Sequence, residues 1–459
     1  MQRSALIPRA FPILAWGLAL HSLLITLLFG WFGLPADLVR AIAGWRDVAL
    51  FALLVYVLIR AVTGRGMGTQ ITFTDFWVAG LFCLGLLFLA GENAWLRTGL
   101  PVKVELMGLR SSVFFFLIYF VGRAGPQLAE DESAMRQIFT LVVVTCVIGI
   151  LERFFLPPEG LVALGVAAYF QDFLGASVMT AGNVYGLPQN YWAGIGGHMV
   201  RRAGSVYLGG QGFAVPFLLF FPIATAWVVG RPHRTKWQIV GYVLVCFAFL
   251  LTLTRMTIIV GCLQLVLFVL MRRRAEWAVA ALAVAGALFL VALVLLPGFS
   301  AFLWYTLSGQ EVSTAGHLND LWNGIIALLE RPWGYGLGTA DAAAARAGLT
   351  HITGDNLFLT YGVELGLAGL MLLILVLGSI AGHALTVFRD SGNGPSRLVG
   401  LSIWLATLGI FVNGMTAVVF NSIVFGWLYF WLAGSIVTLS ERLRVATRSE
   451  HQLELTPVG

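Results

Sequence analysis

Apolar residues fall in long, uninterrupted blocks separated by short polar segments, without the alternation typical of strands. Each block is about 18 to 25 residues long, which is the length of helix needed to cross a hydrocarbon core of about 30 Å. The pattern predicts an all-α polytopic membrane helix bundle of about 12 transmembrane helices, forming one domain over residues 1–459. The expected spans begin near Phe11, Val48, Phe76, Ser111, Gln137, Phe213, Ile239, Thr257, Trp277, Leu357, Leu398 and Ile423.

Two connections, residues 156–212 and 297–356, are much longer than the others, and both are rich in aromatic residues and glycine. Long loops of this kind are usually functional, so we expect them to be ordered and to contain short surface helices. An even number of spans puts both termini on one side. Short basic loops, such as the one containing Arg272, Arg273 and Arg274, predict that this side is the cytoplasm. The two long loops are then external, and residues 441–459 form a cytoplasmic tail.

The composition agrees with a membrane protein, since 59% of the residues are hydrophobic and 11% are charged. Cytoplasmic anchoring is enough to explain the net charge of +6, so no nucleic-acid partner is expected. The four cysteines, Cys83, Cys146, Cys246 and Cys262, lie inside apolar blocks and form neither a disulfide framework nor a metal-binding spacing. No Asp-x-Asp pair occurs in the chain. We therefore expect neither a metal ion nor another cofactor.

The second long loop contains the segment STAGHLNDLWNGIIALLERPWGYGLG, residues 313–338. Its apolar residues recur at helical spacing until Pro332, after which the glycine-rich sequence predicts a turn. The run is too short to cross the bilayer, so the pattern predicts a helix that lies along the outer surface or caps the bundle. A loop helix that only packs is the alternative. His317 precedes the expected apolar face, which comprises Leu318, Leu321, Trp322, Ile325, Ile326 and Leu329.

Several charged residues fall at the predicted external ends of spans, where burial of a charge is costly. Arg255 separates two apolar runs with almost no loop between them, and Arg201 and Arg202 stand just before the sixth expected span. Arginine binds phosphate well because its planar fork reaches two oxygens at once. We therefore expect these arginines to hold the diphosphate of a lipid carrier. For Glu152 and Glu364, simple pairing with an arginine to neutralise buried charge is as good an interpretation as a functional role.

Four segments, in their order and spacing, resemble the superfamily of O-antigen polymerases and O-antigen ligases over roughly residues 200–370. They are RRAGSVYLGGQGFAVPFLLF, LLTLTRMTII, GHLNDLWNGIIALLERPWGYGLGTA and DNLFLTYGVELGLAGL. The resemblance implies a metal-independent glycosyltransferase of the bacterial inner membrane with its active site facing the periplasm. Its expected partners are an undecaprenyl-diphosphate-linked oligosaccharide and the lipid bilayer, and a chain-length regulator is left open as a third.

The resemblance also implies roles for individual residues. Arg201 and Arg255 match functional arginines of the superfamily, and Arg202 is a neighbour able to replace Arg201. Asp355 or His317 is expected to act as the base, and a plain helix cap is the alternative for Asp355. Many members carry an arginine at the position of His317 and a His-Asn pair at Asp355-Asn356. Weaker candidates for contacting the glycan or acceptor are Asn356, Glu364, Trp322 and His351.

Three activities are compatible with these features. We favour a polymerase that transfers the glycan to another lipid-linked repeat unit of a surface polysaccharide. A ligase that transfers it to lipid A core or another acceptor is the first alternative. A transporter or flippase of lipid-linked oligosaccharide is the second, and it is disfavoured because the sequence has no internal repeat.

Overall fold

The computed structural model describes residues 6–63, 70–91, 100–176, 186–195, 198–231, 233–272, 304, 312–340, 355–392 and 394–454. Its first half contains α1 (Leu6–Thr26), η1 (Leu27–Trp31), α2 (Ala36–Ala43), α3 (Trp45–Val62), α4 (Phe73–Gly91), α5 (Val102–Ser112), η3 (Phe114–Leu117), α6 (Ile118–Arg123), α7 (Gln127–Glu130), α8 (Glu132–Phe155), α9 (Pro158–Ala163), α10 (Val166–Ala168) and η4 (Tyr169–Phe173). The chain continues with η5 (Gln189–Tyr191), β1 (Trp192–Ile195), β2 (His198–Arg201), η6 (Ser205–Tyr207), α11 (Gly210–Ala214), α12 (Phe217–Val228), α13 (Lys236–Leu251), α14 (Arg255–Met271), α17 (Val312–Glu330), α19 (Leu357–Asp390), α20 (Pro395–Asn413), η7 (Val419–Asn421) and α21 (Ile423–Glu454).

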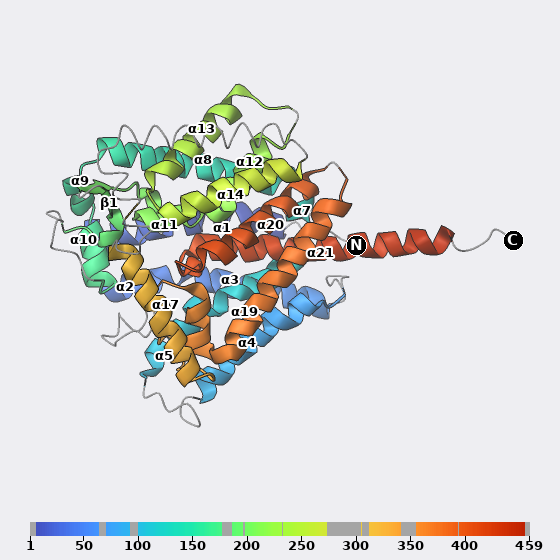
Figure 1. The fold of residues 1–459 in the computed structure, drawn as a ribbon, viewed down its shortest axis with the longest axis horizontal. Coiled ribbons are helices and arrows are strands. Elements are labelled where there is room, and N and C mark those ends of the chain that lie inside the picture. The colour runs from blue at the N-terminus through green and yellow to red at the C-terminus, as the bar shows by residue number, and fades with distance from the viewer. Residues whose placement is uncertain are drawn as a thin grey trace.

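The structure is an all-α membrane bundle, as the sequence predicted (Figure 1). Within the described ranges, nine helical segments are long and apolar enough to cross a membrane, and α13 and α14 are two shorter apolar helices. Each of these matches one of the expected spans. The remaining expected span, which begins near Trp277, lies outside the described residues. The predicted tail continues as helix to Glu454, and the end of α21 projects beyond the bundle in Figure 1.

The centre of the bundle is the close contact between α6 and α21. Gly122 and Gly434 make this contact possible, because a Cβ atom on Gly122 would overlap the carbonyl oxygen of Trp431 and one on Gly434 would overlap that of Tyr119. Small residues at such crossings let two membrane helices approach backbone to backbone. Trp431 and Tyr119 are themselves fully buried, so α21 is enclosed by the surrounding helices.

A buried ion pair joins α4 to α6. Arg123 Nε donates to Asp75 Oδ1 at 2.9 Å, and Tyr119 donates its hydroxyl to the same carboxylate oxygen at 2.7 Å. Arg123 also donates to Thr438 Oγ1 of α21 at 2.9 Å. A buried charge pair is tolerated inside a membrane when its remaining donors and acceptors are also satisfied. This network therefore fixes the positions of three helices relative to one another.

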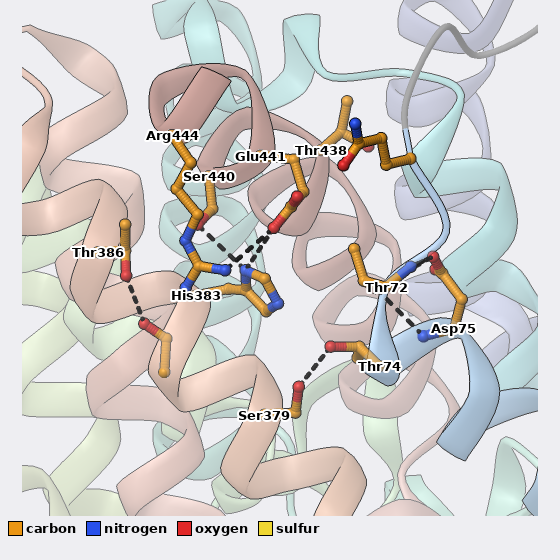
Figure 2. A network of polar contacts seen from close by, with 12 residues as sticks. Thr72, Thr74, Asp75, Ser379, His383, Thr386, Thr438, Ser440, Glu441 and Arg444 are labelled. Carbon is orange, nitrogen blue, oxygen red and sulfur yellow. Dashed lines mark hydrogen bonds and ion pairs between the residues drawn. The ribbon is translucent and has the colours of Figure 1, made fainter. Parts of the chain in front are cut away.

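The same polar region extends to α19, as Figure 2 shows from close by. His383 Nδ1 lies 3.0 Å from Ser440 Oγ and 3.9 Å from Glu441 Oε1, both on α21. Thr74 of α4 and Ser379 of α19 share a hydrogen bond of 2.5 Å. These contacts tie the second half of α19 to the centre of the bundle.

The helix α19 is broken at Gly366, whose φ of 71° and ψ of −173° are not helical. The turn after α17 makes hydrogen bonds at the break, because the amides of Tyr335 and Gly336 donate to the carbonyls of Val363 and Glu364 at 2.7 and 3.1 Å. The amide of Leu367 donates in the opposite direction, to the carbonyl of Pro332 at 2.8 Å. The glycine-rich turn therefore supplies hydrogen bonds to the backbone groups of α19 that the break leaves without helical partners. Irregular backbone inside a membrane is tolerated only when its polar groups have such partners.

The structure confirms a helix before Pro332, and small residues make its contact with the bundle. Gly324 and Ala327 are buried, whereas Leu318, Trp322 and Leu329 are exposed. These small residues lie on the side that packs against α19, and their size lets the two helices approach closely. Most of the predicted apolar face points away from the bundle, which agrees with a helix that lies along the outer surface.

We expect Gly366→Ala to lower the free energy of unfolding by about 1–3 kcal/mol, since the positive φ at position 366 strains a residue with a side chain. The new Cβ would also lie 2.6 Å from the carbonyl oxygen of Pro332. Gly378→Ala in the same helix is the matched control, because no atom lies within 4 Å of the Cβ position there. Thermal unfolding of the purified protein in detergent measures both. Equal stability of the two variants would contradict the role of the break.

Candidate functional site

A short hairpin in the first long loop organises the candidate site. Strands β1 and β2 pair antiparallel, with Trp192 opposite Arg201. The segment that follows β2 is held on two sides, because the amide of Arg202 donates to Tyr191 at 2.8 Å and that of Ala203 to Leu251 at 3.0 Å. Leu251 ends α13. The hairpin therefore places Arg202 at the turn between α13 and α14.

Arg201 is buried against the end of α8. Its Nη2 donates to the carbonyls of Glu152 at 2.9 Å and Arg153 at 2.6 Å. A cation at this position satisfies the last carbonyls of a helix and complements its dipole. Burial lowers the pKa of Arg201, and the carboxylate of Glu152 opposes the shift.

Glu152 holds the chain just after the arginines. Its Oε2 accepts from the amides of Gly204 at 2.8 Å and Ser205 at 2.7 Å. The acid is therefore used by the backbone of the site, as well as being the nearest countercharge to Arg201. Its position explains why the sequence carries an acid at this end of an apolar helix.

Arg202 reaches the turn before α14, whose first residue is Arg255, because a Cβ atom on Gly210 would lie 2.9 Å from the carbonyl oxygen of Thr252. Its side chain crosses Gly210, where a Cβ atom would overlap the Cδ of Arg202. Burial lowers the pKa of Arg202 to about 10, and the positive charge of Arg255 contributes to this shift. Arg202 is still charged at neutral pH. Two arginines thus lie at the same turn in a partly buried place, which is an arrangement that attracts an anion.

The backbone around the arginines is strained. Ser205, Leu208 and Leu253 are the non-glycine residues with positive φ in the part of the chain that the structure describes. Such conformations cost about 1–3 kcal/mol each and gather at functional sites. Leu253 forms the tight connection that ends α13 and brings Arg255 to the site. The three residues therefore surround one location rather than being spread over the bundle.

The same location has unused hydrogen-bonding capacity. Several buried side-chain atoms among the described residues make no hydrogen bond there, and buried polar groups normally have a partner. The capacity is suited to a polar ligand, because donors and acceptors occur together. The atoms are Glu152 Oε1, Asn190 Oδ1, the hydroxyl of Tyr191, Arg201 Nη1 and Arg202 Nε.

A second cluster joins α17 to the start of α19. His317 Nδ1 lies 3.9 Å from Asp355 Oδ2, and both side chains are partly exposed. Asp355 is not the helix cap, since Asn356 is the N-cap residue and its Oδ1 accepts from the amide of Leu359 at 3.0 Å. The structure thus brings the two candidate bases together and leaves the Asp355 carboxylate outside the cap.

Hydrogen bonds connect the two clusters. Thr257, two residues after Arg255, donates to Asn413 at the end of α20 at 3.2 Å. The next residues of that chain, Gly414 and Met415, accept from the amide of Leu357 at 2.8 Å and the side chain of Asn356 at 3.0 Å. The arginines and the His317–Asp355 pair therefore lie at the same end of the bundle.

The weaker candidates occupy different environments. Asn356 is buried and uses both ends of its amide in the contacts above. Glu364 is fully buried and accepts from Ser112 at 2.8 Å and from the amide of Gly338 at 3.0 Å. Trp322 points outward from α17 and is 64% exposed. His351 lies outside the described residues.

One segment that carries part of this geometry is similar to a known protein family. Residues 240–374 match the family model described as O-antigen ligase. Over this segment the chain is similar to the O-antigen ligase family. This match confirms the resemblance to the O-antigen polymerase and ligase superfamily. No curated protein matches the chain.

The matched segment extends from α13 into α19 and therefore contains Arg255, His317 and Asp355. Arg201 and Arg202 lie outside it and reach it through the hairpin. Among the residues that the structure describes, no three His, Cys, Asp or Glu side chains are close enough to hold a metal ion.

Several residues at the site were not predicted from the sequence. Asn190 and Tyr191 belong to a loop whose hairpin was not expected, and Tyr191 has no exposed surface. The residue types of Ser205, Leu208 and Leu253 do not indicate that their φ angles are positive. The run of glycines after Arg202 was the one visible signal, because Gly204, Gly209 and Gly210 mark close approaches of the backbone to Tyr191, Asn190 and Arg202.

We expect Arg201→Ala to destabilise the protein by about 2–3 kcal/mol, since it removes charged hydrogen bonds to two helix carbonyls. Arg202→Ala is the matched control and should cost less, because it also relieves the repulsion with Arg255. Thermal unfolding of both variants in the same detergent makes the comparison. A larger loss in Arg202→Ala would show that these two roles are reversed.

Proposed function

We propose that the protein is a glycosyltransferase that takes a glycan from a polyprenyl diphosphate carrier and transfers it to an acceptor hydroxyl. The observation that carries this proposal is the placement of Arg202 at the strained, partly buried turn that leads into α14, whose first residue is Arg255. A diphosphate is the leaving group of such a reaction, and its negative charge grows as the bond to the sugar breaks. Fixed cations aimed at that charge lower the barrier.

The start of α14 supports an anion at the same place. Thr254 is its N-cap residue, and its side chain makes no capping hydrogen bond. The first amides of a helix and its dipole favour a negatively charged group. A diphosphate held by Arg255 would also meet this end of the helix. Arg201 contributes indirectly, by fixing the hairpin on α8.

The acceptor hydroxyl needs a base, and we assign this role to Asp355 with His317 as its partner. The carboxylate takes the hydroxyl proton while the oxygen attacks the anomeric carbon, and the diphosphate leaves with the bonding electron pair. Both side chains are accessible to an acceptor that enters from outside the bundle. Histidine at 3.9 Å is close enough to orient the carboxylate after a small movement.

We favour another lipid-linked repeat unit as the acceptor, which makes the protein a polymerase of surface polysaccharide. The aspartate at position 355, where many ligases have a histidine, supports this choice. Ligation to lipid A core or another acceptor is the second candidate, favoured by the description of the matching family. Incubation with lipid-linked oligosaccharide alone separates the two, because only a polymerase lengthens it. A transporter would neither lengthen the oligosaccharide nor transfer it to another acceptor.

We expect Arg255→Ala and Arg202→Ala to lower kcat by about 10²–10³-fold, the usual loss when one group that stabilises a developing anion is removed. The assay is turnover of lipid-linked oligosaccharide by the purified protein. Arg40→Ala is the matched control, because Arg40 is an exposed arginine paired with Asp37 at 3.0 Å. Unchanged turnover in both site variants would reject the arginine pair as the diphosphate site.

Asp355→Asn should lower kcat more than it weakens binding of the carrier, because the amide cannot accept the hydroxyl proton. His317→Gln should give a smaller loss, since glutamine still offers a hydrogen bond to the carboxylate. Steady-state kinetics and carrier binding measured on the same preparations separate the two effects. A rise in KM with unchanged kcat in Asp355→Asn would contradict the role of a base.

A further inference from the structure

A cavity of about 680 Å³ lies at the end of the bundle away from the site described above. Glu132 at the start of α8 and Arg272 just after α14 line it, whereas Glu152 and Arg255 at the opposite ends of these helices belong to the candidate site. About twenty residues of helix span about 30 Å, the thickness of the hydrocarbon core. The cavity and the candidate site therefore face opposite sides of the membrane.

The rim of the cavity is basic. Arg231, Arg234 and Arg272 line it together with a single acid, Glu132. Arg231 is held in place, because its Nη2 donates to Glu132 at 2.7 Å and its guanidinium lies 4.2 Å from the ring centre of Trp227. Arg234 is exposed at the mouth of the cavity. Positive charge thus exceeds negative charge on this rim.

The start of α20 adds to the positive potential. Gly394 is the N-cap residue of this helix, makes no side-chain capping bond, and lines the cavity with Pro395. The amides that follow belong to a helix of 19 residues, whose dipole favours an anion. This helix end supports an anion site only in combination with the arginines.

Apolar side chains also line the cavity. They belong to Met135, Val229, Phe268 and Leu398. A small hydrated anion gains nothing from such side chains, whereas an amphiphile uses both parts. Trp237, beside the cavity loop, is 83% exposed, as interfacial tryptophans are. Basic pockets between transmembrane helices bind the head groups of anionic lipids in this way.

We propose that this cavity binds an anionic phospholipid, with its phosphate on Arg231, Arg234 and Arg272 and its acyl chains along the apolar side chains. The site is separate from the proposed transferase chemistry and does not depend on it. With the orientation expected from the basic loops, it faces the cytoplasm. It would anchor the loop between α12 and α13 to the ends of α8, α14 and α20.

The test measures binding of phosphatidylglycerol to the full-length protein by native mass spectrometry. Phosphatidylcholine with the same acyl chains, and inorganic phosphate, are measured in parallel. Each arginine near an anionic surface contributes about fivefold in affinity, so Arg234→Gln should weaken binding about fivefold and Arg234→Gln with Arg272→Gln about 25-fold. Arg389→Gln is the matched control, since Arg389 is an exposed arginine near the end of α19 and does not line the cavity.

Selective loss in the two cavity variants, with Arg389→Gln like the unmodified protein, supports the proposal. Equal binding by all variants, or equal binding of phosphatidylcholine, would overturn it. Competition by inorganic phosphate at concentrations similar to those of the lipid would assign the arginines to a free anion and overturn the lipid. Arg234 is exposed, so its single variant decides between these outcomes even if the double variant does not fold.

Discussion

Every backbone amide and carbonyl inside a membrane must find a partner within the protein, and this constraint shapes the part of the structure on which function depends. The helix α19 is interrupted at Gly366, and the turn after α17 takes the place of the missing helical bonds. A surface helix is thereby attached to a membrane helix by backbone hydrogen bonds, which do not depend on side-chain identity. His317 and Asp355 stand at the far ends of these two helices, so the same attachment holds the candidate bases in register.

Charged residues in the bundle fall into two groups. In one group the charge is fully used: Asp75 and Arg123 bind each other and their neighbours, and Glu364 accepts from two elements. Such residues fix the positions of helices. In the other group, around Arg202 and Tyr191, buried polar atoms retain unused capacity and the backbone is strained. The contrast separates residues that build the bundle from those that we assign to a ligand.

The sequence predicted the spans well because hydrophobic blocks of membrane length leave few alternatives. It also predicted Arg255 between two helices, since an arginine flanked by apolar runs must lie at a helix end. It predicted α17 as a helix but did not indicate that Gly324 and Ala327 make its contact with the bundle, because in a membrane protein large apolar side chains can face outward. It also missed the capping role of Asn356 and the contacts of Arg201 with α8. These depend on which segments meet in three dimensions, and residue types alone do not specify that.

The helices differ in how much of their surface meets lipid. The membrane segment of α21 is almost entirely enclosed by protein, whereas most of the segment formed by α2 and α3 is not. Hydrophobic mismatch is relieved by tilting of helices that touch the acyl chains. A thicker or thinner bilayer therefore acts on the periphery and leaves the Gly122–Gly434 crossing at a constant depth. The depth of this crossing within the protein is therefore independent of the lipid composition of the membrane.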